Sequence, residues 1–434
     1  MTFVSHRPVA VDLFAGAGGF SIGMEQAGFD IAVAVEKDPI HAAVYSYNKP
    51  NTNVLCANVI EVSGEDILKA LEEWALCHEY SSNNLPNISL VYGGPPCQGF
   101  SSIGKRQVDD RRNNLLFEFM RIVRELQPDY FIIENVPGLL SHKYSSLVQR
   151  LLDDFKSAGY QITEPIQILD ASNFGVPQKR RRVFILGNRK GIEPLCYPPV
   201  QILSVAEAIT VRDAIADLPN LDDFDELLHR DWLGLSGAQL YQMQTRASDY
   251  AKRLRNLIPD EDNFAYPRWW NPRLLTSSMR TEHESSSTLR FKAVAPGKME
   301  QTSRLKRLHW AHQCYTLRAG TDAQRGAHTS ARPLHPEYPR VISVREAARL
   351  HSFPDWYRFH VTKWHGFREV GNAVPPMLAR SLGKQVITAL SHTPTVPETT
   401  LELGDPNLLE FDNNRAVMHW LGVQRASRKQ SSVR

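Results

Sequence analysis

The alternation of short apolar runs with segments of helical spacing is the feature that most constrains the fold of this 434-residue chain. Strand-like apolar runs occupy residues 8–14, 31–35, 89–92, 130–133 and 183–186, and helical spacing occupies residues 21–27, 66–76 and 115–126. Strands that alternate with helices predict an α/β fold with a parallel, doubly wound sheet. Ligands of such a sheet bind at the carboxyl ends of its strands.

The alternation stops near residue 189. Residues 189–342 are irregular and rich in Pro, Ser, Arg and Trp, which predicts a second, smaller domain of mixed structure. Helical spacing returns at residues 343–351, where Ser343 and Glu346 form a capping pattern, and a further helix follows Pro376. We therefore expect one domain from residues 1–188 and 343–390. Residues 391–434 are expected to be a partly flexible extension that ends in a frayed basic tail.

Composition limits the class of protein. With 42% hydrophobic and 22% charged residues, the chain can bury a sizeable core. No run of about 18 apolar residues occurs, and residues 1–7 lack an apolar signal core, so we expect a cytoplasmic protein without a membrane span. The five cysteines show no CxxC spacing, so no metal site or redox pair is predicted.

Charge is distributed unevenly along the second half of the chain. Residues 207–231 hold eight acidic and two basic residues, whereas residues 265–340 hold thirteen Lys and Arg against five Asp and Glu, with three tryptophans. Basic residues interleaved with aromatic rings suit a nucleic-acid surface, because phosphates bind cations and bases stack on rings. A solvated charged face explains the same composition equally well.

A glycine-rich turn, DLFAGAGGF at residues 12–20, closes the first strand and opens the first helix. Gly16, Gly18 and Gly19 would let the backbone approach a ligand. Glu36, at the end of the next strand, could accept both ribose hydroxyls of a nucleoside. The spacing departs from GxGxxG and the turn offers no basic group for a pyrophosphate, so S-adenosylmethionine, met by Asp12 and Phe14, is favoured over NAD.

Cys97 lies in the turn GGPPCQGFS, residues 93–101, directly after a predicted strand. A thiol at that sheet edge is a candidate nucleophile, although a lone cysteine more often packs as a small hydrophobe. Glu134 begins ENVPG after another strand and could donate to a ring nitrogen, or could equally be a capping or salt-bridged acid. In QKRRR, residues 178–182, Arg180 and Arg182 share one face of an extended segment.

Methylation of cytosine at carbon 5 uses all of these groups. Addition of a thiolate to carbon 6 makes carbon 5 nucleophilic enough to accept a methyl group. The charge that enters the ring is stabilised by an acid at N3 and a cation near O2. Methylation of an exocyclic amine would need no thiol, so Cys97 favours the carbon-5 reaction.

The chain resembles the DNA (cytosine-5)-methyltransferases in six ordered motifs: DLFAGAGGF (12–20), GGPPCQGFS (93–101), ENVPG (134–138), QKRRRVFILG (178–187), SVREAARLHSFPDWY (343–357) and GNAVPPMLA (371–379). The resemblance implies Cys97 as nucleophile, Glu134 at N3 and N4 of the base, Arg182 near O2 and Arg180 as support near phosphate. The implied cofactor contacts, together with those of the turn, are Asp12, Phe14, Ala15, Gly16, Gly18, Gly19, Glu36, Lys37, Asn58, Pro96 and Asn372.

The family fold is Rossmann-like and carries a smaller target-recognition domain, here residues 189–342, with DNA between the two and the target base flipped out of the helix. Residues 101–112 would form a mobile loop that closes over DNA. Asn58 stands where the family usually has an aspartate that binds adenine, and Lys37 where it often has a bulkier stacking side chain, so the resemblance implies retained but weaker cofactor binding.

The sequence therefore predicts a monomeric DNA (cytosine-5)-methyltransferase, the modification enzyme of a restriction-modification system, whose partner endonuclease acts independently. Two alternatives remain open from the sequence. One is a cytosine-5 methyltransferase that acts on RNA. The other is a catalytically silent DNA-binding regulator on the same fold, although such proteins usually lose the cysteine, the acid or the glycine turn.

Overall fold

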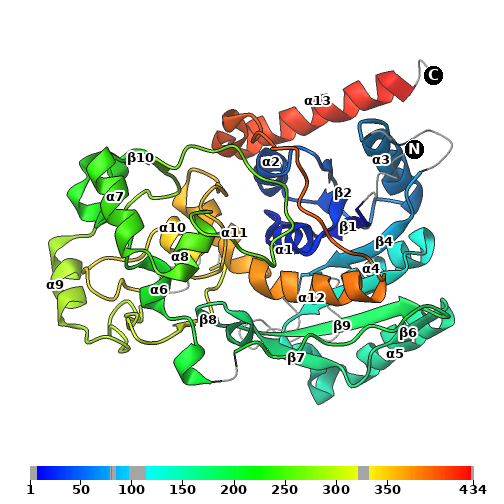
Figure 1. Cartoon of the computed structure of the whole chain (residues 1–434), viewed down its shortest axis with the longest axis horizontal. Coiled ribbons are helices and arrows are strands. Elements are labelled where there is room, and N and C mark those ends of the chain that lie inside the picture. Colours follow the sequence, from blue (N-terminus) through cyan, green and yellow to red (C-terminus); the bar gives the residue numbers. More distant parts are fainter. Residues whose placement is uncertain are drawn as a thin grey trace.

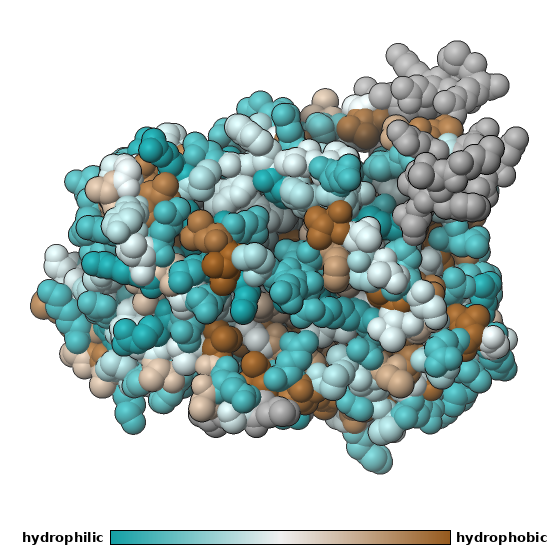
Figure 2. All heavy atoms as spheres, in the orientation of Figure 1, coloured by the Kyte–Doolittle hydropathy of each residue, from teal (hydrophilic) through white to brown (hydrophobic). Residues whose placement is uncertain are grey.

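The computed structural model describes residues 7–78, 80, 85–96, 114–202, 204–320 and 332–431. Two lobes are visible in Figure 1: a sheet lobe built around the β-strands, and a second lobe of short helices and loops at the left, formed by residues 204–320 and 332–342 together with residues 344–349. Figure 2 shows a largely hydrophilic face with small, separate apolar patches. Within the described ranges, no helix has both the length and the apolar character needed to cross a bilayer.

The sheet in the described part of the chain has eight strands in the order β3-β2-β1-β4-β5-β9-β6, with β7 paired to β9. The strands are β1 (Val9–Leu13), β2 (Asp30–Glu36), β3 (Asn53–Cys56), β4 (Ile88–Gly93), β5 (Tyr130–Asn135), β6 (Tyr160–Ile162), β7 (Gln167–Asp170) and β9 (Arg181–Arg189). Strands β1 to β5 are mutually parallel, but β9 runs antiparallel to β5, and β6 and β7 run antiparallel to β9.

The α/β class is thus confirmed, but the prediction of a wholly parallel sheet is wrong for the half that contains β9. The apolar run of β9 fits a buried strand in either direction, because the alternation of side chains along a strand does not depend on its direction. Direction was decided by the chain that leads into β9, which passes through β6 and β7 rather than through a crossover helix.

Helices cover both faces of the sheet. Phe131 and Ile133 of β5 point into a cluster with α3, α4 and α5, whereas Tyr130 and Ile132 point into a cluster with α1 and α12. These helices are α1 (Gly19–Ala27), α3 (Gly64–Leu76), α4 (Asn114–Leu126), α5 (Ser145–Ser157) and α12 (Pro376–Ala389). Because α12 follows the second lobe in sequence, the chain returns to complete the sheet lobe.

The strands and helices predicted from periodicity are present at nearly the predicted bounds, including the capping box of Ser343 and Glu346 at α10 (Val344–Arg349). Helices α2 (Pro39–Asn48) and α5 are among those that were not predicted. Helix α2 is buried on nearly all sides, so it has no polar face to show a helical period. Helix α5 does carry buried residues at helical spacing, so that signal was present in the sequence.

The second lobe has short elements joined by long irregular segments, as its composition predicts. They are α6 (Val211–Ile215), β10 (Leu233–Gly234), α7 (Gly237–Arg246), α8 (Asp249–Leu254), β11 (Leu274–Leu275), α9 (Ser285–Ala293) and β12 (Cys314–Tyr315). Strand β12 pairs with β8 (Gln178–Lys179), so the second lobe is joined to the sheet lobe beside the arginine-rich segment.

Buried charged side chains fix the packing of α10. Arg349, at the end of α10, donates hydrogen bonds to Asp355 and to Asp217, and Arg255 donates to Asp355 at 2.7 Å. Burial alone would raise the pKa of Asp355, but these arginines hold that pKa well below its usual range. Asp217 and Arg255 belong to the second lobe, so this cluster fixes α10 and the segment after it against α6 and α8.

Replacement of Asp355 by alanine is expected to lower the free energy of unfolding by about 3–5 kcal/mol, because it leaves buried arginine charges without their partner. Urea denaturation measures this loss. Asp262, whose partner is Lys384 at the surface, provides a matched control, and D262A should cost less than about 1 kcal/mol. Equal losses of unfolding free energy in D355A and D262A would show that the buried cluster contributes no more to stability than a surface ion pair.

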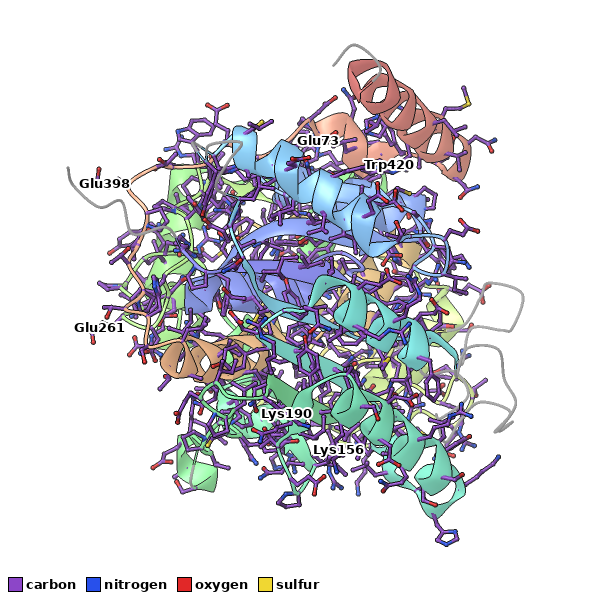
Figure 3. All side chains as sticks on the ribbon, turned by 90° about the vertical axis from the view of Figure 1, so that its right-hand side faces the viewer. Glu73, Lys156, Lys190, Glu261, Glu398 and Trp420 are labelled. Atoms are coloured by element: carbon purple, nitrogen blue, oxygen red, sulfur yellow. The ribbon has the colours of Figure 1, made fainter. Side chains whose placement is uncertain are left out.

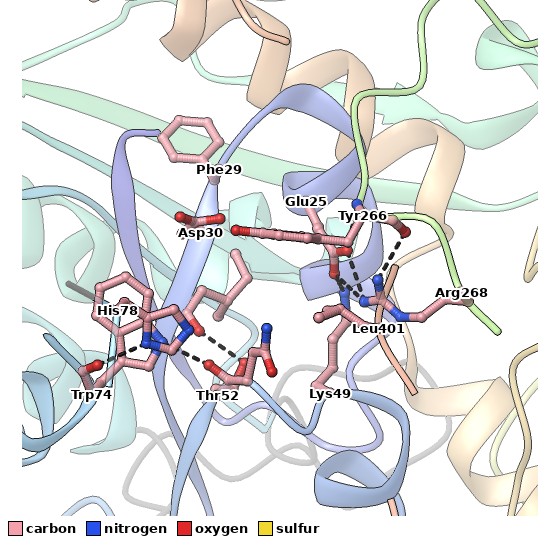
Figure 4. A pocket seen from close by; sticks show the side chains of 12 residues that line it. Glu25, Phe29, Asp30, Lys49, Thr52, Trp74, His78, Tyr266, Arg268 and Leu401 are labelled. Carbon is pink, nitrogen blue, oxygen red and sulfur yellow. Dashed lines mark hydrogen bonds and ion pairs between the residues drawn. The ribbon is translucent and has the colours of Figure 1, made fainter. Parts of the chain in front are cut away.

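A second buried cluster, drawn in Figure 4, ties α1 to the second lobe. Glu25 forms ion pairs with Lys49 and with Arg268, whose Nη2 lies 2.7 and 2.9 Å from the two carboxylate oxygens. The backbone N–H of Tyr266 also donates to Glu25 at 3.1 Å. The cluster lies between a space of about 20 Å³ and a larger one of about 450 Å³. Because its charged groups are paired with one another, we interpret the cluster as structural.

The expectation that residues 391–434 form a partly flexible extension with a frayed basic end did not include the ordered elements found at residues 406–423. A 3-10 helix, Pro406–Glu410, and helix α13 (Asn413–Ser431) follow the extended segment after α12. Leu409, Ala416 and Trp420 are buried against the sheet lobe. The basic composition of the extreme end suggested solvent exposure, but apolar residues at helical spacing upstream of it determine the packing.

Candidate active site

The carboxyl ends of β1, β2, β4 and β5 open onto a cavity of about 770 Å³, here called the central cavity. Most of the site residues predicted from the sequence line it: Asp12, Phe14, Ala15, Gly16, Gly19, Glu36, Lys37, Asn58, Pro96, Glu134, Arg180, Arg182 and Asn372. Gly18 is not one of its lining residues. Cys97 and the loop 101–112 lie outside the described residues, and Cys97 directly follows Pro96 in sequence.

The glycines of the turn after β1 serve different purposes. A Cβ at Gly16, where φ is +53°, would meet nothing within 4 Å. A Cβ at Gly18 would lie 3.0 Å from the ring of Tyr45, and one at Gly19 would lie 2.7 Å from the Cβ of Ala373. All three had been expected to make room for a ligand, but only Gly16 has open space, whereas Gly18 and Gly19 make room for neighbouring protein groups.

Glu36 is held in a fixed position at the end of β2. Its Oε2 accepts the backbone N–H of Gly16 and its Oε1 accepts that of Asp38, each at 2.7 Å. A carboxylate oxygen can accept more than one hydrogen bond, so both oxygens can still accept a hydroxyl group. The carboxylate is therefore oriented by the turn on one side and by the start of α2 on the other.

Asp12 is buried at the base of the cavity. Its Oδ2 accepts the hydroxyl of Ser21 at 2.6 Å, and the hydroxyls of Tyr45 and Tyr92 lie 2.7 and 2.6 Å from the same serine oxygen. Burial raises the pKa of Asp12 to about 8. This network joins β1, α1, α2 and β4, so Asp12 stabilises their packing in addition to lining the cavity.

Asn58 and Lys37 line the wall formed by β2 and the loop after β3. The Oδ1 of Asn58 accepts the backbone N–H of Ile60 at 3.3 Å and can accept one more hydrogen bond. Lys37 is exposed, so its alkyl stem is accessible from the cavity. The apolar side chains of Phe14, Val35 and Ile60 also line the cavity, so the wall combines apolar surface with a few polar groups.

Glu134 forms an ion pair with Arg182, whose Nε lies 2.8 Å from its Oε1. The antiparallel pairing of β5 and β9 makes this contact, because it places Glu134 opposite Phe184, near Arg182. A Cβ at Gly94 would lie 3.0 Å from the other carboxylate oxygen, so a glycine there keeps space beside Glu134. The Glu134 carboxyl group and the Arg182 guanidinium are thus paired at the wall of the cavity.

The predicted arrangement of the arginine-rich segment is confirmed: Arg180 is buried and Arg182 half-buried at the cavity, whereas Lys179 and Arg181 are exposed. Arg180 does more than line the cavity. Its guanidinium donates to the carbonyls of Leu317 and Gly371, each at 2.8 Å, and so joins the second lobe to α11 (Lys363–Asn372). These contacts give Arg180 a structural role, and its predicted support near phosphate stays a prediction.

Sequence reasoning missed several residues of the site. Asn135, buried at the end of β5, donates from Nδ2 to the carbonyl of Pro95 at 3.2 Å and so anchors the turn that leads to Cys97. His41 and Glu369 are buried in the cavity wall, and burial raises the pKa of Glu369 to about 7. The asparagine in ENVPG was a visible signal, whereas nothing local marks His41 or Glu369.

Other reactive groups do not form a second centre within the described part of the chain. Cys56 is half-buried and Cys314 buried, and burial raises the pKa of Cys56 to about 12. Cys77 and Cys196 are exposed. No group of three or more His, Cys, Asp or Glu side chains among the described residues is placed to bind a metal ion.

Comparison with known proteins identifies the family to which the chain belongs. The family model for C-5 cytosine-specific DNA methylases matches residues 9–388. The chain is 45% identical over 403 residues to the type II methyltransferase M.XorII of Xanthomonas oryzae, covering 93% of this chain and 90% of that protein. It is 30% identical over 395 residues to M.DdeI of Desulfomicrobium norvegicum, covering 87% of this chain and 88% of that protein.

A solved structure agrees with these relationships. The crystal structure of a candidate DNA modification methyltransferase encoded within an Escherichia coli prophage superposes with a TM-score of 0.70 at 31% identity, covering 89% of this chain and all of that one. The sheet and its cavity are thus those of a Rossmann-like methyltransferase. More narrowly, the chain belongs to the C-5 cytosine-specific DNA methylase family and is a DNA (cytosine-5)-methyltransferase.

Proposed function

We propose that the protein transfers a methyl group from S-adenosylmethionine to carbon 5 of a cytosine that is flipped out of duplex DNA, through a covalent adduct on Cys97. The observation that carries this proposal is that one continuous cavity contains both the oriented Glu36 carboxylate and the Glu134–Arg182 pair. A nucleoside held by Glu36 and a base held by Glu134 would therefore share one space, with Pro96 in its wall.

The residues of the central cavity fit S-adenosylmethionine. Glu36 can accept the ribose hydroxyls, Asn58 and Lys37 lie on the wall where adenine would bind, and Gly16 leaves space for the backbone to approach the ligand. When bound, S-adenosylmethionine supplies an electrophilic methyl group.

The remaining chemistry falls to the protein side chains. The Cys97 thiolate forms a bond to carbon 6 of cytosine, Glu134 holds a proton at N3, and Arg182 stabilises charge at O2. Carbon 5 would then bond to the methyl group, with S-adenosylhomocysteine as the leaving group, and lose its proton to a base. The bond between carbon 6 and the Cys97 sulfur then breaks and the thiolate is restored. Asn135, through Pro95, fixes the start of the segment that carries Cys97.

Duplex DNA requires cationic groups beside the cavity. Lys179, Arg181 and Arg318, here called the basic strip, are exposed where β8 pairs with β12 next to Arg180 and Arg182. Elsewhere in the basic stretch, Arg268, Arg307 and Arg340 are buried in structural contacts. These buried arginines fit neither a nucleic-acid surface nor a solvated charged face, and we assign phosphate binding to the basic strip.

Alanine at both Lys179 and Arg318 is expected to weaken DNA binding and to lower the slope of log Kd against log salt by about 2, since each lost phosphate contact removes about 0.9 from that slope. Fluorescence anisotropy over a salt series measures both quantities. The matched control is the K156A/K190A double variant, whose lysines project from the opposite end of the sheet lobe (Figure 3). An unchanged slope in the first variant would remove the basic strip from the interface.

The biological setting follows from the relatives, which are type II methyltransferases. We infer that the protein protects host DNA in a restriction-modification system, with an independent endonuclease of the same specificity, and that it works as a monomer in the cytoplasm, where the DNA is. Bisulfite sequencing of plasmid DNA from expressing cells tests the proposal directly. Bisulfite conversion of every cytosine would contradict the proposal. Protection of a cytosine within one recurrent sequence would support the proposal and identify the recognition sequence.

A further inference from the structure

The C-terminal extension packs against the cofactor side of the central cavity. The matched family region ends at residue 388, so the extension is an addition to the family core. Its 3-10 helix and α13 both pack along α2. Two backbone hydrogen bonds hold the segment in place: Gly404 N–H donates to the Tyr47 carbonyl at 2.8 Å, and Val361 N–H donates to the Leu409 carbonyl at 3.0 Å. In addition, the His360 side chain donates from Nε2 to the Phe411 carbonyl at 2.9 Å.

Helix α13 is bonded to the start of α2 by the buried side chain of Trp420. Trp420, labelled in Figure 3 on the inner side of the helix, is 6% exposed, and its Nε1 donates to the carbonyl of Pro39 at 2.9 Å. Pro39 is the first residue of α2, and Asp38 before it is the N-cap. The backbone N–H of Asp38 is the group that holds Oε1 of Glu36. Trp420 is thus separated from the Glu36 carboxylate by one short turn.

The extension also contributes directly to the cavity. Asn413, the first residue of α13, is one of its lining residues, together with Asp38, Pro39 and Arg368. Asn414, the next residue, is exposed and is not one of the residues that line the cavity. The two consecutive asparagines therefore differ in their relation to the cavity although their chemistry is the same.

We propose that the extension is a part of the cofactor site: Trp420 acts as a positioning residue that fixes the Asp38 turn and through it Glu36, and Asn413 completes the cavity wall. This inference rests on the proposed binding of S-adenosylmethionine. A hydrogen bond donated to Pro39 restricts the backbone of the turn, so the Asp38 N–H stays directed at Glu36. The carboxylate then meets the ribose hydroxyls without first having to be ordered, which improves affinity.

The test measures the dissociation constant of S-adenosylhomocysteine by calorimetry on the full chain. Trp420→Phe keeps the ring but removes the N–H, and we expect it to weaken binding about two- to tenfold, the range of one hydrogen bond. Trp74→Phe is the matched control, because the Trp74 indole likewise donates to a backbone carbonyl, that of Asn51, in the same lobe. We expect W74F to bind like the wild type.

A second ligand separates positioning from general structural damage. If Trp420 acts through Glu36, the weakening caused by W420F should disappear with 2′,3′-dideoxy-S-adenosylhomocysteine, which has no ribose hydroxyls. A structural defect would weaken both ligands equally, and that result would overturn the inference. In the same assay, Asn413→Ala should weaken binding about two- to tenfold while Asn414→Ala leaves it unchanged.

The outcomes also distinguish this inference from the proposed function. Wild-type protein that fails to bind S-adenosylhomocysteine at all would refute the cofactor assignment and the inference with it. Wild-type protein that binds, with W420F and N413A indistinguishable from it, would leave the cofactor assignment intact and refute only the role of the extension.

Discussion

Replacing Cys97 by serine is expected to reduce methyl transfer by at least about 10⁴-fold while leaving DNA binding intact. A serine hydroxyl is far less acidic than a thiol, so at neutral pH it cannot supply the anion that adds to carbon 6. Single-turnover transfer of tritiated methyl groups to a duplex that contains the recognition sequence measures the loss. Anisotropy with the same duplex measures binding.

The expected loss has a chemical counterpart in a trapping experiment. A duplex with 5-fluorocytosine at the target position cannot lose a proton from carbon 5, so the wild type should remain bound to it as an adduct at Cys97. Cys77 and Cys196 are exposed and provide controls, since C77S and C196S should still form the adduct. Robust turnover by C97S, or an adduct on another cysteine, would contradict the mechanism.

The second large effect is expected from Glu134→Gln, which should lower the single-turnover rate by about 10²–10⁴-fold with little change in cofactor affinity. Glutamine keeps the shape of the side chain but cannot exchange a proton with N3, and it also removes the charge that holds Arg182 at 2.8 Å. The reaction thus loses both the acid and the orientation of the cation, whereas Glu36 is untouched.

The sheet itself supplies the control for this variant. Arg189 and Asp129 form another ion pair across β5 and β9, 2.5 Å apart, at the far end of the same two strands from Glu134. Asp129→Asn should change the rate by no more than about twofold, because this pair is solvent-exposed and remote from the cavity. Equal losses in D129N and E134Q would show that only the packing of the strands had been disturbed.

Several parts of the site could be predicted from local sequence. Glu36 and Glu134 each follow an apolar run, and the alternation of strands with helices implies that such positions meet at one sheet edge. The alternate burial of Lys179, Arg180, Arg181 and Arg182 also follows from local geometry, because successive side chains of an extended segment point to opposite sides. In each case the signal lies within a few neighbouring residues.

Other parts could not be predicted, because they depend on which distant segments meet. The contact of Gly18 with Tyr45 and the bonds from Arg180 to Leu317 and Gly371 join residues that no local pattern relates. Composition marked residues 265–340 as basic but could not separate the buried Arg307 from the exposed Arg318. Burial of an arginine is decided by the carbonyls and carboxylates that surround it after folding.

The sequence by itself determined the α/β class, and it predicted the chemistry at Cys97 and Glu134 and the sheet edge where we propose that this chemistry takes place, because strand and helix periods and turn residues act over short stretches of chain. Only the tertiary structure decided that β9 runs antiparallel and so pairs Arg182 with Glu134, and that α13 packs against the start of α2. The direction of a strand and the docking of a helix depend on surfaces brought together from distant residues, and those surfaces exist only once the chain has folded.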